Sequence, residues 1–542
     1  MRQQKLQDLW MRTARVLAIL LPFLALNFSG AAKGAERILF IPHDNRPISM
    51  QQSAEVAEAA GYSIHMPPEE FLSRGVNEPG HPEELWKWLE ENARLARAAV
   101  LSTDSLLYGG LIASRKHELS QEVLQERLSK FQKFHAKHPG LAIYLFGSLM
   151  RTPKSGEYAG SEEPDYYIPY GKDIFEYTAL ADKEEMGYLT SGERKKMKEA
   201  RERIPTEVFD DWMNRRAKNL AATKELAELT AKGVARSFII GKDDNAPLCQ
   251  THKENRELHA FAKEKGIPQE KVFSLTGIDE FNLLLLTRAV NDLKGEIPFV
   301  HVRYNEGMGG ETIPSFSDET IEKSIRDAVL VAGGMMVPTP ARADFVLLVN
   351  TDPKGRTGEA SESTPGATPL VNDGKERRGT KHFFRMVEDS MEKGYPVGIA
   401  DIAFANGSDN ALMKNLEQKG ILPKLRAYAG WNTATNSAGF ALGTGMLAPH
   451  MTEEGRKRLL TRRFLDDWAY QANVRTEISR QLGEEGRWEA YIRLDKHRPE
   501  MEERTAKRLR QFAQERFPSQ WNLNHLKVSF PWNRMFECGL DF

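Results

Sequence analysis

The 542-residue sequence has only two cysteines, Cys249 and Cys538. Two thiols cannot build a disulfide framework or a cysteine-rich zinc site, so packing has to stabilise the fold. A single bridge between them is one interpretation, and two inert thiols are the simpler one. The sequence also lacks net charge, because 75 Lys and Arg stand against 76 Asp and Glu, which leaves −1. A protein that binds a nucleic-acid backbone needs a basic face, and we therefore expect no nucleic-acid partner.

Several catalytic motifs are absent as well. The sequence contains no GxxxxGK[ST] phosphate loop, no HExxH zinc helix and no GxSxG nucleophile elbow. Its histidines are scattered, and none pairs with another at the spacing of metal ligands. These absences argue against nucleotide-dependent and zinc-dependent chemistry. We expect no cofactor, with a divalent cation as the alternative.

The most apolar run in the sequence lies near the N-terminus. Four basic residues within the first 15 precede the apolar run 16–26, and small residues follow at 29–32. This order is typical of a secretory signal, and the run is shorter than the ~20 residues that span a bilayer. We predict a signal peptide over 1–35 and a secreted or periplasmic mature chain. In the alternative, a retained signal segment anchors the chain to the membrane. An extracytoplasmic location favours hydrolysis or binding over NTP-driven chemistry.

Ten short aliphatic or β-branched runs recur along the chain, and each is followed by turn residues and a helical pattern. Strands that are apolar on both faces and alternate with helices are typical of parallel sheets covered on both sides. Ten units are too many for one eight-stranded barrel. The runs are 38–41, 63–65, 99–102, 142–146, 237–240, 272–275, 299–302, 345–349, 397–400 and 426–428.

We therefore predict an α/β fold of parallel β/α units. The N-terminal domain is expected to be barrel-like or doubly wound, and it is followed by a second α/β unit and a helical tail. The boundaries that we predict are 36–295 with a helical insertion at 152–235, then 296–450, then 451–542. Residues 353–380, rich in Gly, Ser, Thr and Pro, should form a long mobile loop. The charge-rich helix 456–463 should present a solvated face.

Polar residues collect where the predicted strands end, and ligands of α/β proteins bind at the carboxyl ends of parallel strands. Asp44 and Arg46 lie between two prolines after the first strand, where a structural ion pair is the alternative. Asp104 follows the third strand directly, where it could instead cap the next helix. The candidate substrate-binding residues are Asp44, Arg46, Tyr108, Arg115, Arg151, Asn245, Asn406, Asp409, Trp431, Asn432 and Asn436.

The densest acidic pair is Asp243-Asp244, after the fifth strand. Adjacent carboxylates repel, so one of them should have a raised pKa unless a cation or an arginine neutralises it. General acid–base pairs and divalent-metal sites both use this arrangement, whereas a helix cap beside a surface acid is the alternative. The candidate catalytic residues are Asp243, Asp244 and Asp104.

The tenth strand leads into Trp431, Asn432 and Asn436. An indole ring beside short hydrogen-bonding side chains suits a sugar, whose C–H face stacks while its hydroxyls need directional partners. Trp431 as a core residue, with the amides as capping groups, is the alternative.

Seven segments of the chain resemble one bacterial family, the domain of unknown function 4127 (DUF4127). They are IPHDNRP (41–47), STDSLLYGGLIASR (102–115), GKDDNAP (241–247), DIAFANGSD (401–409), AYAGWNTATN (427–436), DDWAYQANVR (466–475) and PWNRMFE (531–537). The resemblance covers nearly the whole mature chain and implies membership without an activity. Members typically carry Asp where this chain has His43, and Gly near the position of Leu248.

The leading functional hypothesis is a secreted hydrolase of a carbohydrate or glycoconjugate, with carboxylates as acid and base. In it Arg46, Arg115 and Arg151 orient the substrate or set the carboxylate pKa values. One alternative is a non-catalytic glycan- or solute-binding protein whose two α/β units close around a ligand. Another is a metal-dependent hydrolase with Asp243, Asp244, Asn245 and Asp409 as oxygen ligands. The expected partner is a small molecule or glycan, and the oligomeric state is left open.

Overall fold

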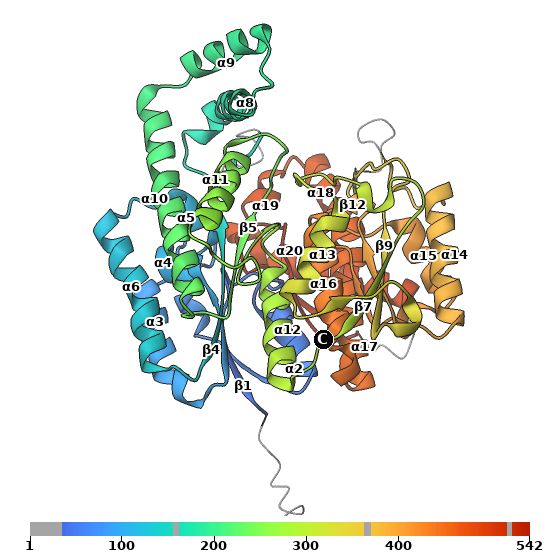
Figure 1. Ribbon diagram of the computed structural model, residues 1–542. Coiled ribbons are helices and arrows are strands. Elements are labelled where there is room, and N and C mark those ends of the chain that lie inside the picture. Colours follow the sequence, from blue (N-terminus) through green and yellow to red (C-terminus); the bar gives the residue numbers. More distant parts are fainter. Residues whose placement is uncertain (1–34, 155–161, 363–369, 518–522) are drawn as a thin grey trace, which may run out of the picture. The chain divides into compact units, whose positions relative to one another are not determined.

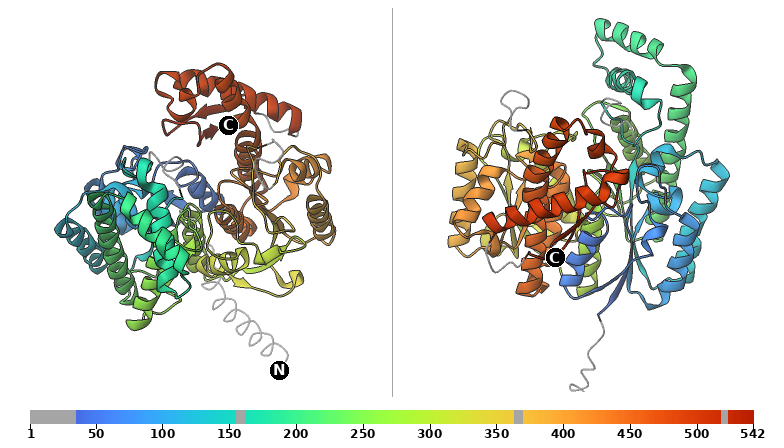
Figure 2. Two further views of the ribbon diagram at one scale, coloured as in Figure 1. Left: turned by 90° about the horizontal axis from the view of Figure 1, so that it is seen from above. Right: turned by 180° about the vertical axis from the view of Figure 1, so that it is seen from behind.

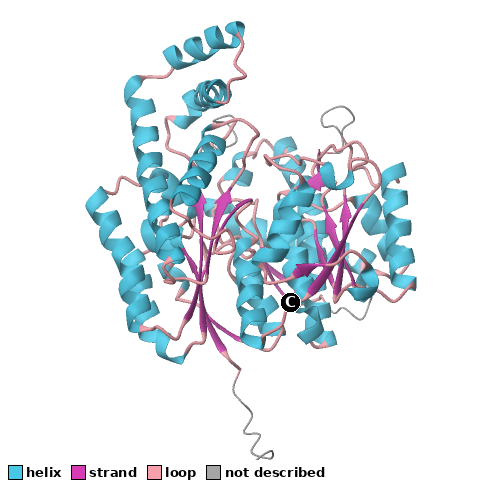
Figure 3. Ribbon diagram, viewed as in Figure 1, coloured by secondary structure: helices cyan, strands magenta, loops and turns pink. Residues whose placement is uncertain are grey.

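Two open parallel sheets dominate the computed structural model, which describes residues 35–154, 162–362, 370–517 and 523–542 (Figure 3). The predicted signal peptide, apart from Ala35, lies outside the described residues. None of the helices in the described ranges is long and apolar enough to cross a membrane. The two parallel sheets confirm the predicted α/β class. The barrel-like alternative is wrong because both sheets are open.

The first sheet has six parallel strands in the order β2-β1-β3-β4-β5-β6. Its central strands are apolar on both faces, as strands covered on both sides must be. The strands are β1 (Arg37–Ile41), β2 (Ser63–His65), β3 (Ala98–Ser102), β4 (Ala142–Leu149), β5 (Ser237–Lys242) and β6 (Val272–Thr276).

The second sheet has five parallel strands in the order β13-β11-β9-β7-β8. Numbered along the chain within each sheet, both sheets share the order 2-1-3-4-5, so the second repeats the topology of the first. Each sheet is doubly wound, and its switch point lies between its first and third strands, β1/β3 and β7/β9. The strands are β7 (Phe299–Tyr304), β8 (Met335–Met336), β9 (Phe345–Asn350), β11 (Val397–Asp401) and β13 (Ala427–Ala429).

Helices cover both faces of the first sheet. The outer face packs against α3 (Pro82–Asn92), α6 (Gln121–Lys137), α10 (Thr206–Ala231) and α11 (Gln250–Glu264). The inner face packs against α2 (Gln51–Ala59) and α12 (Phe281–Lys294). Two short helices, α4 (Thr103–Tyr108) and α5 (Leu111–Lys116), follow β3 and lead the chain past the candidate residues Asp104 to Arg115.

The second sheet is covered in the same way. Its inner face packs against α13 (Ile321–Val331) and α16 (Ala434–Leu447), and its outer face against α14 (Arg378–Glu392) and α15 (Asn410–Gln418). Every residue of α16 is buried. Its small residues allow this: a Cβ on Gly439 would lie 2.6 Å from Cγ of Glu280, and one on Gly445 would lie 2.0 Å from the ring of Phe345.

One apolar core joins the two sheets. It contains Phe40 and Val100 from the first sheet, Leu347 and Ala400 from the second, and the facing sides of α12 and α16 between them. Residues 37–542 accordingly form a single compact unit. The boundary predicted at residue 295 falls between α12 and β7, which is where the chain passes from one sheet to the other.

The helical segments outside the sheets follow the predicted pattern. In Figure 1, α8 (Tyr167–Glu185) and α9 (Ser191–Arg203) extend away from the first sheet, whereas α10 packs on it. The C-terminal helices, red in Figure 2, pack on the outer face of the second sheet. They are α17 (Glu453–Arg463), α18 (Arg475–Glu484), α19 (Glu489–Ile492) and α20 (Arg498–Arg516), with a π-helix over Phe464–Val474.

Four short strands lie outside the two sheets. β10 (Gly358–Glu359) pairs with β12 (Phe404–Ala405), and β14 (Lys527–Ser529) pairs with β15 (Gly539–Asp541). The segment 353–380, expected to be a loop throughout, thus contains a strand, and residues 363–369 within it lie outside the described ranges. Cys249 and Cys538 are both buried free thiols, so they do not form a bridge.

Candidate functional site

The loop after β1 carries a buried arginine held between two carboxylates. Arg46 donates from Nε to Oδ2 of Asp44 (2.9 Å) and from Nη2 to Oδ1 of Asp279 (2.6 Å), which follows β6. Burial alone would raise the pKa of Asp279, but Arg46 and His43 lower it to about 2. The Asp44–Arg46 pair therefore reaches across the sheet end to a residue 233 positions later.

Asp279 gathers two further side chains. Nε2 of His43 lies 3.0 Å from Oδ1 of Asp279, and Nδ2 of Asn432 donates to Oδ2 over 3.2 Å. Asn282 Nδ2 lies 3.2 Å from the other ring nitrogen of His43. Asn432 comes from the loop after β13, so this cluster already joins the carboxyl ends of both sheets.

Asp104 lies at the first turn of α4, next to the β1/β3 switch point. It is 2% exposed and accepts hydrogen bonds from Oγ (2.8 Å) and the backbone N–H (3.4 Å) of Ser148. Burial raises the pKa of Asp104 to about 6, although the bonds from Ser148 lower it. Gly147 makes this packing fit, because a Cβ there would lie 2.0 Å from Oγ1 of Thr103 and 3.4 Å from Oδ1 of Asp104.

Two arginines hold the acidic pair after β5. Arg115 Nη2 donates to Oδ2 of Asp243 over 2.5 Å, and Arg151 Nη1 donates to Oδ2 of Asp244 over 2.6 Å. Arg151 also donates from Nε to Glu163 over 2.7 Å. Two of the predicted arginines, Arg115 and Arg151, thus come together around this acidic pair, whereas Arg46 binds Asp44 and Asp279.

Asp244 differs from Asp243 in its exposure and in its backbone conformation. Its side chain is 31% exposed against 15%, and its backbone has φ of +42°, a strained value for a residue other than glycine. Burial and the charge of Asp243 raise the pKa of Asp244 to about 7, whereas Arg151 and Arg115 lower it. Asp244 is therefore a carboxyl group that reaches solvent and keeps its proton near neutral pH, which is what a general acid requires.

The second sheet contributes through Asn406, which follows β12. Its backbone N–H donates to the carbonyl of Asn432 (2.8 Å), and its Nδ2 donates to Oε2 of Glu359 (3.0 Å). Both asparagines have left-handed backbones, with φ of +59° and +58°. Burial raises the pKa of Glu359, which Asn406 and Arg475 lower. Strained backbone of this kind clusters at functional sites.

The C-terminal segment 531–537 completes the cluster. Nε1 of Trp532 donates to Oδ1 of Asn45 over 2.9 Å, and Arg46 lies over the indole ring at 5.3 Å. Arg534 donates to Glu162 (2.7 Å) and to Glu537 (2.8 Å). The guanidinium of Arg475 lies over the ring of Phe536, 4.7 Å from its centroid.

Comparison with models of known protein families shows which family the chain belongs to. The family model described as "Protein of unknown function (DUF4127)" matches residues 38–541. The chain belongs to the DUF4127 family. Comparison with curated proteins and with solved structures gives no match.

In this DUF4127 protein, each of the seven segments that resemble the family supplies at least one residue to the cluster. The sequence missed several participants, although Arg475, Trp532, Arg534 and Glu537 lie within two of the seven segments. Glu162, Glu163 and Glu359 lie outside all seven, and nothing in the sequence pattern singled them out. The residues missed as site candidates are His43, Glu162, Glu163, Asp279, Glu359, Arg475, Trp532, Arg534 and Glu537.

Four predicted residues point into the protein instead. Trp431 is 3% exposed and lies in the core that joins the sheets, so it is not a surface for stacking a sugar. Asn436 is buried on α16. Tyr108 stacks on His117 with ring centroids 4.8 Å apart, and Asn245 accepts a hydrogen bond from the thiol of Cys249. A position at a strand end does not by itself fix where a side chain points.

Asp409 belongs to a separate buried network on the second sheet. Its Oδ1 accepts the backbone N–H of Ala411 and so caps α15, and its Oδ2 accepts from Arg377 and Thr380. The neighbouring Asp401 is held by Asn350, and burial together with Asp409 raises the pKa of Asp401 to about 7. This network stabilises the end of the second sheet, and its partners in the described part of the chain do not include Asp243 or Asp244.

The four candidate metal ligands therefore do not share a site. Asp243 and Asp244 face arginines, Asn245 faces Cys249, and Asp409 caps a helix of the other sheet. Within the described ranges, no three His, Cys, Asp or Glu side chains are placed to hold a metal ion.

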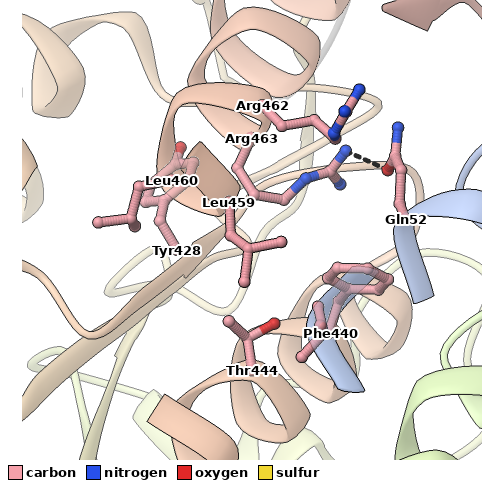
Figure 4. A pocket seen from close by; sticks show the side chains of 9 residues that line it. Gln52, Tyr428, Phe440, Thr444, Leu459, Leu460, Arg462 and Arg463 are labelled. Carbon is pink, nitrogen blue, oxygen red and sulfur yellow. Dashed lines mark hydrogen bonds between the residues drawn. The ribbon is translucent and has the colours of Figure 1, made fainter. Parts of the chain in front are cut away.

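Two hollows lie elsewhere. A cavity of about 10 Å³ between α2, α16 and α17 is lined by nine residues, and Figure 4 shows Arg463 bonded to Gln52 at its edge. A space of this size holds at most one water. A groove of about 420 Å³ lies between α3 and α6, where Lys130 and Lys137 pair with Glu83 and Glu90. Neither hollow is lined by a residue of the strand-end cluster.

Proposed function

We propose that this DUF4127 protein is an extracytoplasmic hydrolase of a carbohydrate or glycoconjugate, with Asp244 as general acid and Asp243 as general base. One observation carries the proposal: the two adjacent carboxyl groups lie in unlike surroundings. Asp243 is held by Arg115, whereas Asp244 is more exposed and burial raises its pKa to about 7. A carboxyl group whose pKa is raised toward neutral pH is typical of a general acid.

In the proposed reaction, protonated Asp244 donates its proton to the glycosidic oxygen as the bond to the anomeric carbon breaks. The leaving sugar departs as an alcohol. Asp243 takes a proton from the attacking water as the water oxygen bonds to the anomeric carbon. Asp243 then releases this proton to solvent and Asp244 takes one up, which restores both groups for the next turnover. Arg151, bonded to Asp244 at 2.6 Å, orients the acid. Asp104 is buried and bonded to Ser148, so it supports the site and does not touch substrate.

A carbohydrate is supported by the partly exposed amides rather than by an aromatic surface. Asn406 and Asn432 are half-buried, and each donates its side-chain N–H to a carboxylate. Amide–carboxylate pairs present donors and acceptors side by side, as vicinal hydroxyl groups require. Because Trp431 lies in the core, we do not propose that a sugar ring stacks on it.

The alternative function, a non-catalytic protein whose two α/β units close around a ligand, is the weaker candidate. Closure of two α/β units around a ligand needs a hinge between them, whereas here α12 and α16 join both sheets in one apolar core. A metal-dependent hydrolase is also weaker, because an arginine already pairs with each of the two carboxylates and the four candidate ligands do not share a site.

The test is a hydrolysis screen of aryl glycosides and peptidoglycan fragments with wild-type protein and the Asp244→Asn variant. We expect at least one glycoside to be cleaved, and kcat/KM to fall at least 100-fold in the variant, since general acids contribute about 10²–10⁴-fold. Asp389→Asn, on the exposed face of α14, is the matched control and should retain full activity. Cleavage that survives Asp244→Asn unchanged would remove Asp244 from the mechanism.

A further inference from the structure

Three arginines from separate elements converge on one carboxylate beside the proposed acid. Arg115 Nη1 lies 3.3 Å from Oε2 of Glu162, Arg151 Nη2 lies 3.0 Å from the same oxygen, and Arg534 Nη1 donates to Oε1 over 2.7 Å. The arginines come from α5, the end of β4 and the C-terminal segment 531–537. We name this group the arginine triad.

Each arginine of the triad already has another carboxylate partner. Arg115 is bonded to Asp243, Arg151 to Asp244 and Glu163, and Arg534 to Glu537. Glu162 is therefore an additional carboxylate. The three arginines share it, although each of them already has a carboxylate that balances its charge. One anion at its place could be exchanged for another without changing the net charge of the cluster.

The triad is buried on one side and reaches solvent on the other. The side chains of Arg115 and Arg151 are 2% and 7% exposed, whereas those of Glu162 and Arg534 are 19% and 21% exposed. Glu162 and Arg534 are thus the more solvent-exposed members of the group. Neighbouring Glu163 is fully buried, and its Oε2 has no hydrogen-bond partner among the described residues, so one acceptor beside the triad is left unsatisfied.

The surroundings of Glu162 favour negative charge. Burial alone would raise the pKa of Glu162, but Arg151, Arg534 and Arg115 hold it well below its ordinary value. Three guanidinium groups around one carboxylate also match the geometry of oxyanion recognition, because each presents parallel N–H donors.

We infer that the arginine triad binds an anionic substituent of the substrate, a carboxylate or another oxyanion on a sugar, in the place that the Glu162 carboxylate occupies in the free protein. The inference rests on the proposed function and narrows it to acidic carbohydrates. Arg151 links the two sites, because its Nη1 bonds Asp244 while its Nη2 faces the oxyanion position. A substituent bound there would hold its sugar next to the acid.

The test measures binding of D-glucuronate, D-glucose and inorganic sulfate to the purified protein by titration calorimetry. We expect glucuronate to bind at least tenfold more tightly than either of the others, because only glucuronate combines the oxyanion with a sugar ring. Glucose binding as tightly as glucuronate would overturn the inference. Sulfate binding as tightly as glucuronate would also overturn it, since the triad would then be a site for free inorganic anions.

Two variants probe the triad directly. Glu162→Gln removes the competing anion and should tighten glucuronate binding several-fold, whereas Arg534→Gln should weaken it about tenfold, the effect of one charge-assisted hydrogen bond. The matched controls are Glu199→Gln on α9 and Arg480→Gln on α18, both exposed, which should leave binding unchanged. An unchanged affinity in folded Glu162→Gln and Arg534→Gln proteins would contradict the inference.

The outcomes separate this inference from the proposed function. Asp244→Asn should abolish turnover while it preserves glucuronate binding. Turnover of neutral glycosides without any preference for acidic ones would support the hydrolase function but would contradict oxyanion binding by the arginine triad. Glucuronate binding with no hydrolysis of any glycoside would support oxyanion binding by the arginine triad but would contradict the hydrolase function.

Discussion

Gly147 shows how closely the residues behind the site are packed. Because a Cβ there would lie 2.0 Å from Oγ1 of Thr103, Gly147→Ala must displace Thr103 and with it the neighbouring Asp104. We expect a loss of about 2 kcal/mol in the free energy of unfolding, as in overpacked cores, measured by urea denaturation.

Gly140→Ala is the control for this substitution. Gly140 is exposed, and a Cβ there would meet no atom within 4 Å, so its effect should stay within about 0.5 kcal/mol. Equal stability of the Gly147→Ala and Gly140→Ala proteins would show that the contact between β4 and α4 can relax freely.

Residue types at strand ends predicted part of the site. Asp44, Arg46, Asp243 and Asp244 were expected at one sheet edge, and the structure brings them into one cluster. The same logic placed Trp431 there, although its side chain turns into the core. The position of a residue along a strand can be inferred from the sequence, but the direction of its side chain depends on packing against other elements.

A second prediction that was wrong at the scale of single residues took charged side chains as a sign of exposure to solvent. The helix 456–463 was expected to present a solvated face, yet Arg456, Arg462 and Arg463 are at most 6% exposed. Arg462 pairs with Glu55 on α2, and Arg463 pairs with Asp466. An ion pair with a residue 407 positions away, such as Arg462 with Glu55, leaves no periodic signal in the sequence.

At the scale of elements, α16 is the piece that holds the two sheets together. A Cβ on Gly445 would lie 2.0 Å from the fully buried ring of Phe345, so Gly445→Ala cannot be accommodated by a shift toward solvent. We expect Gly445→Ala to lower the free energy of unfolding by about 3 kcal/mol in urea denaturation.

A second substitution checks the cause. Phe345→Leu removes the ring, so the Gly445→Ala, Phe345→Leu double variant should lose less than the sum of the single variants. Gly483→Ala, at an exposed position of α18 with nothing within 4 Å, is the control and should stabilise the helix slightly. Additive losses in the double variant would contradict a clash with Phe345.

All ten predicted strands are present, with ends displaced by at most three residues. Their apolar, β-branched composition reports burial on both faces, and that signal is local. The five that were missed, β8, β10, β12, β14 and β15, have two or three residues each. Such short strands depend on a partner segment that sequence periodicity does not identify.

At the scale of the whole molecule, the shared core predicts that both sheets unfold together. Separate domains would each need their own apolar core, whereas α12 and α16 bury their facing sides against each other. We expect a single calorimetric transition whose van't Hoff and calorimetric enthalpies agree. Two resolved transitions, or a folded 37–295 fragment, would show that the sheets are independent.

The repeated topology and the shared core were not evident from the sequence. The two sheets have the same strand order without a repeat of fixed period, and α16 differs from an ordinary surface helix in being apolar or small on almost every side. A helix that is buried on every side indicates a core, but not which sheets it joins.

The pH dependence of turnover tests the central claim most directly. Because the pKa of Asp244 is raised to about 7, the acid keeps its proton below that pH and loses it above. On the best glycoside from the screen, kcat/KM of the wild-type protein should fall about tenfold per pH unit above pH 7, and Asp244→Asn should abolish this limb along with most of the activity. A rate that is constant or rises through pH 7, with the same profile in Asp244→Asn, would contradict the assignment of Asp244 as the general acid.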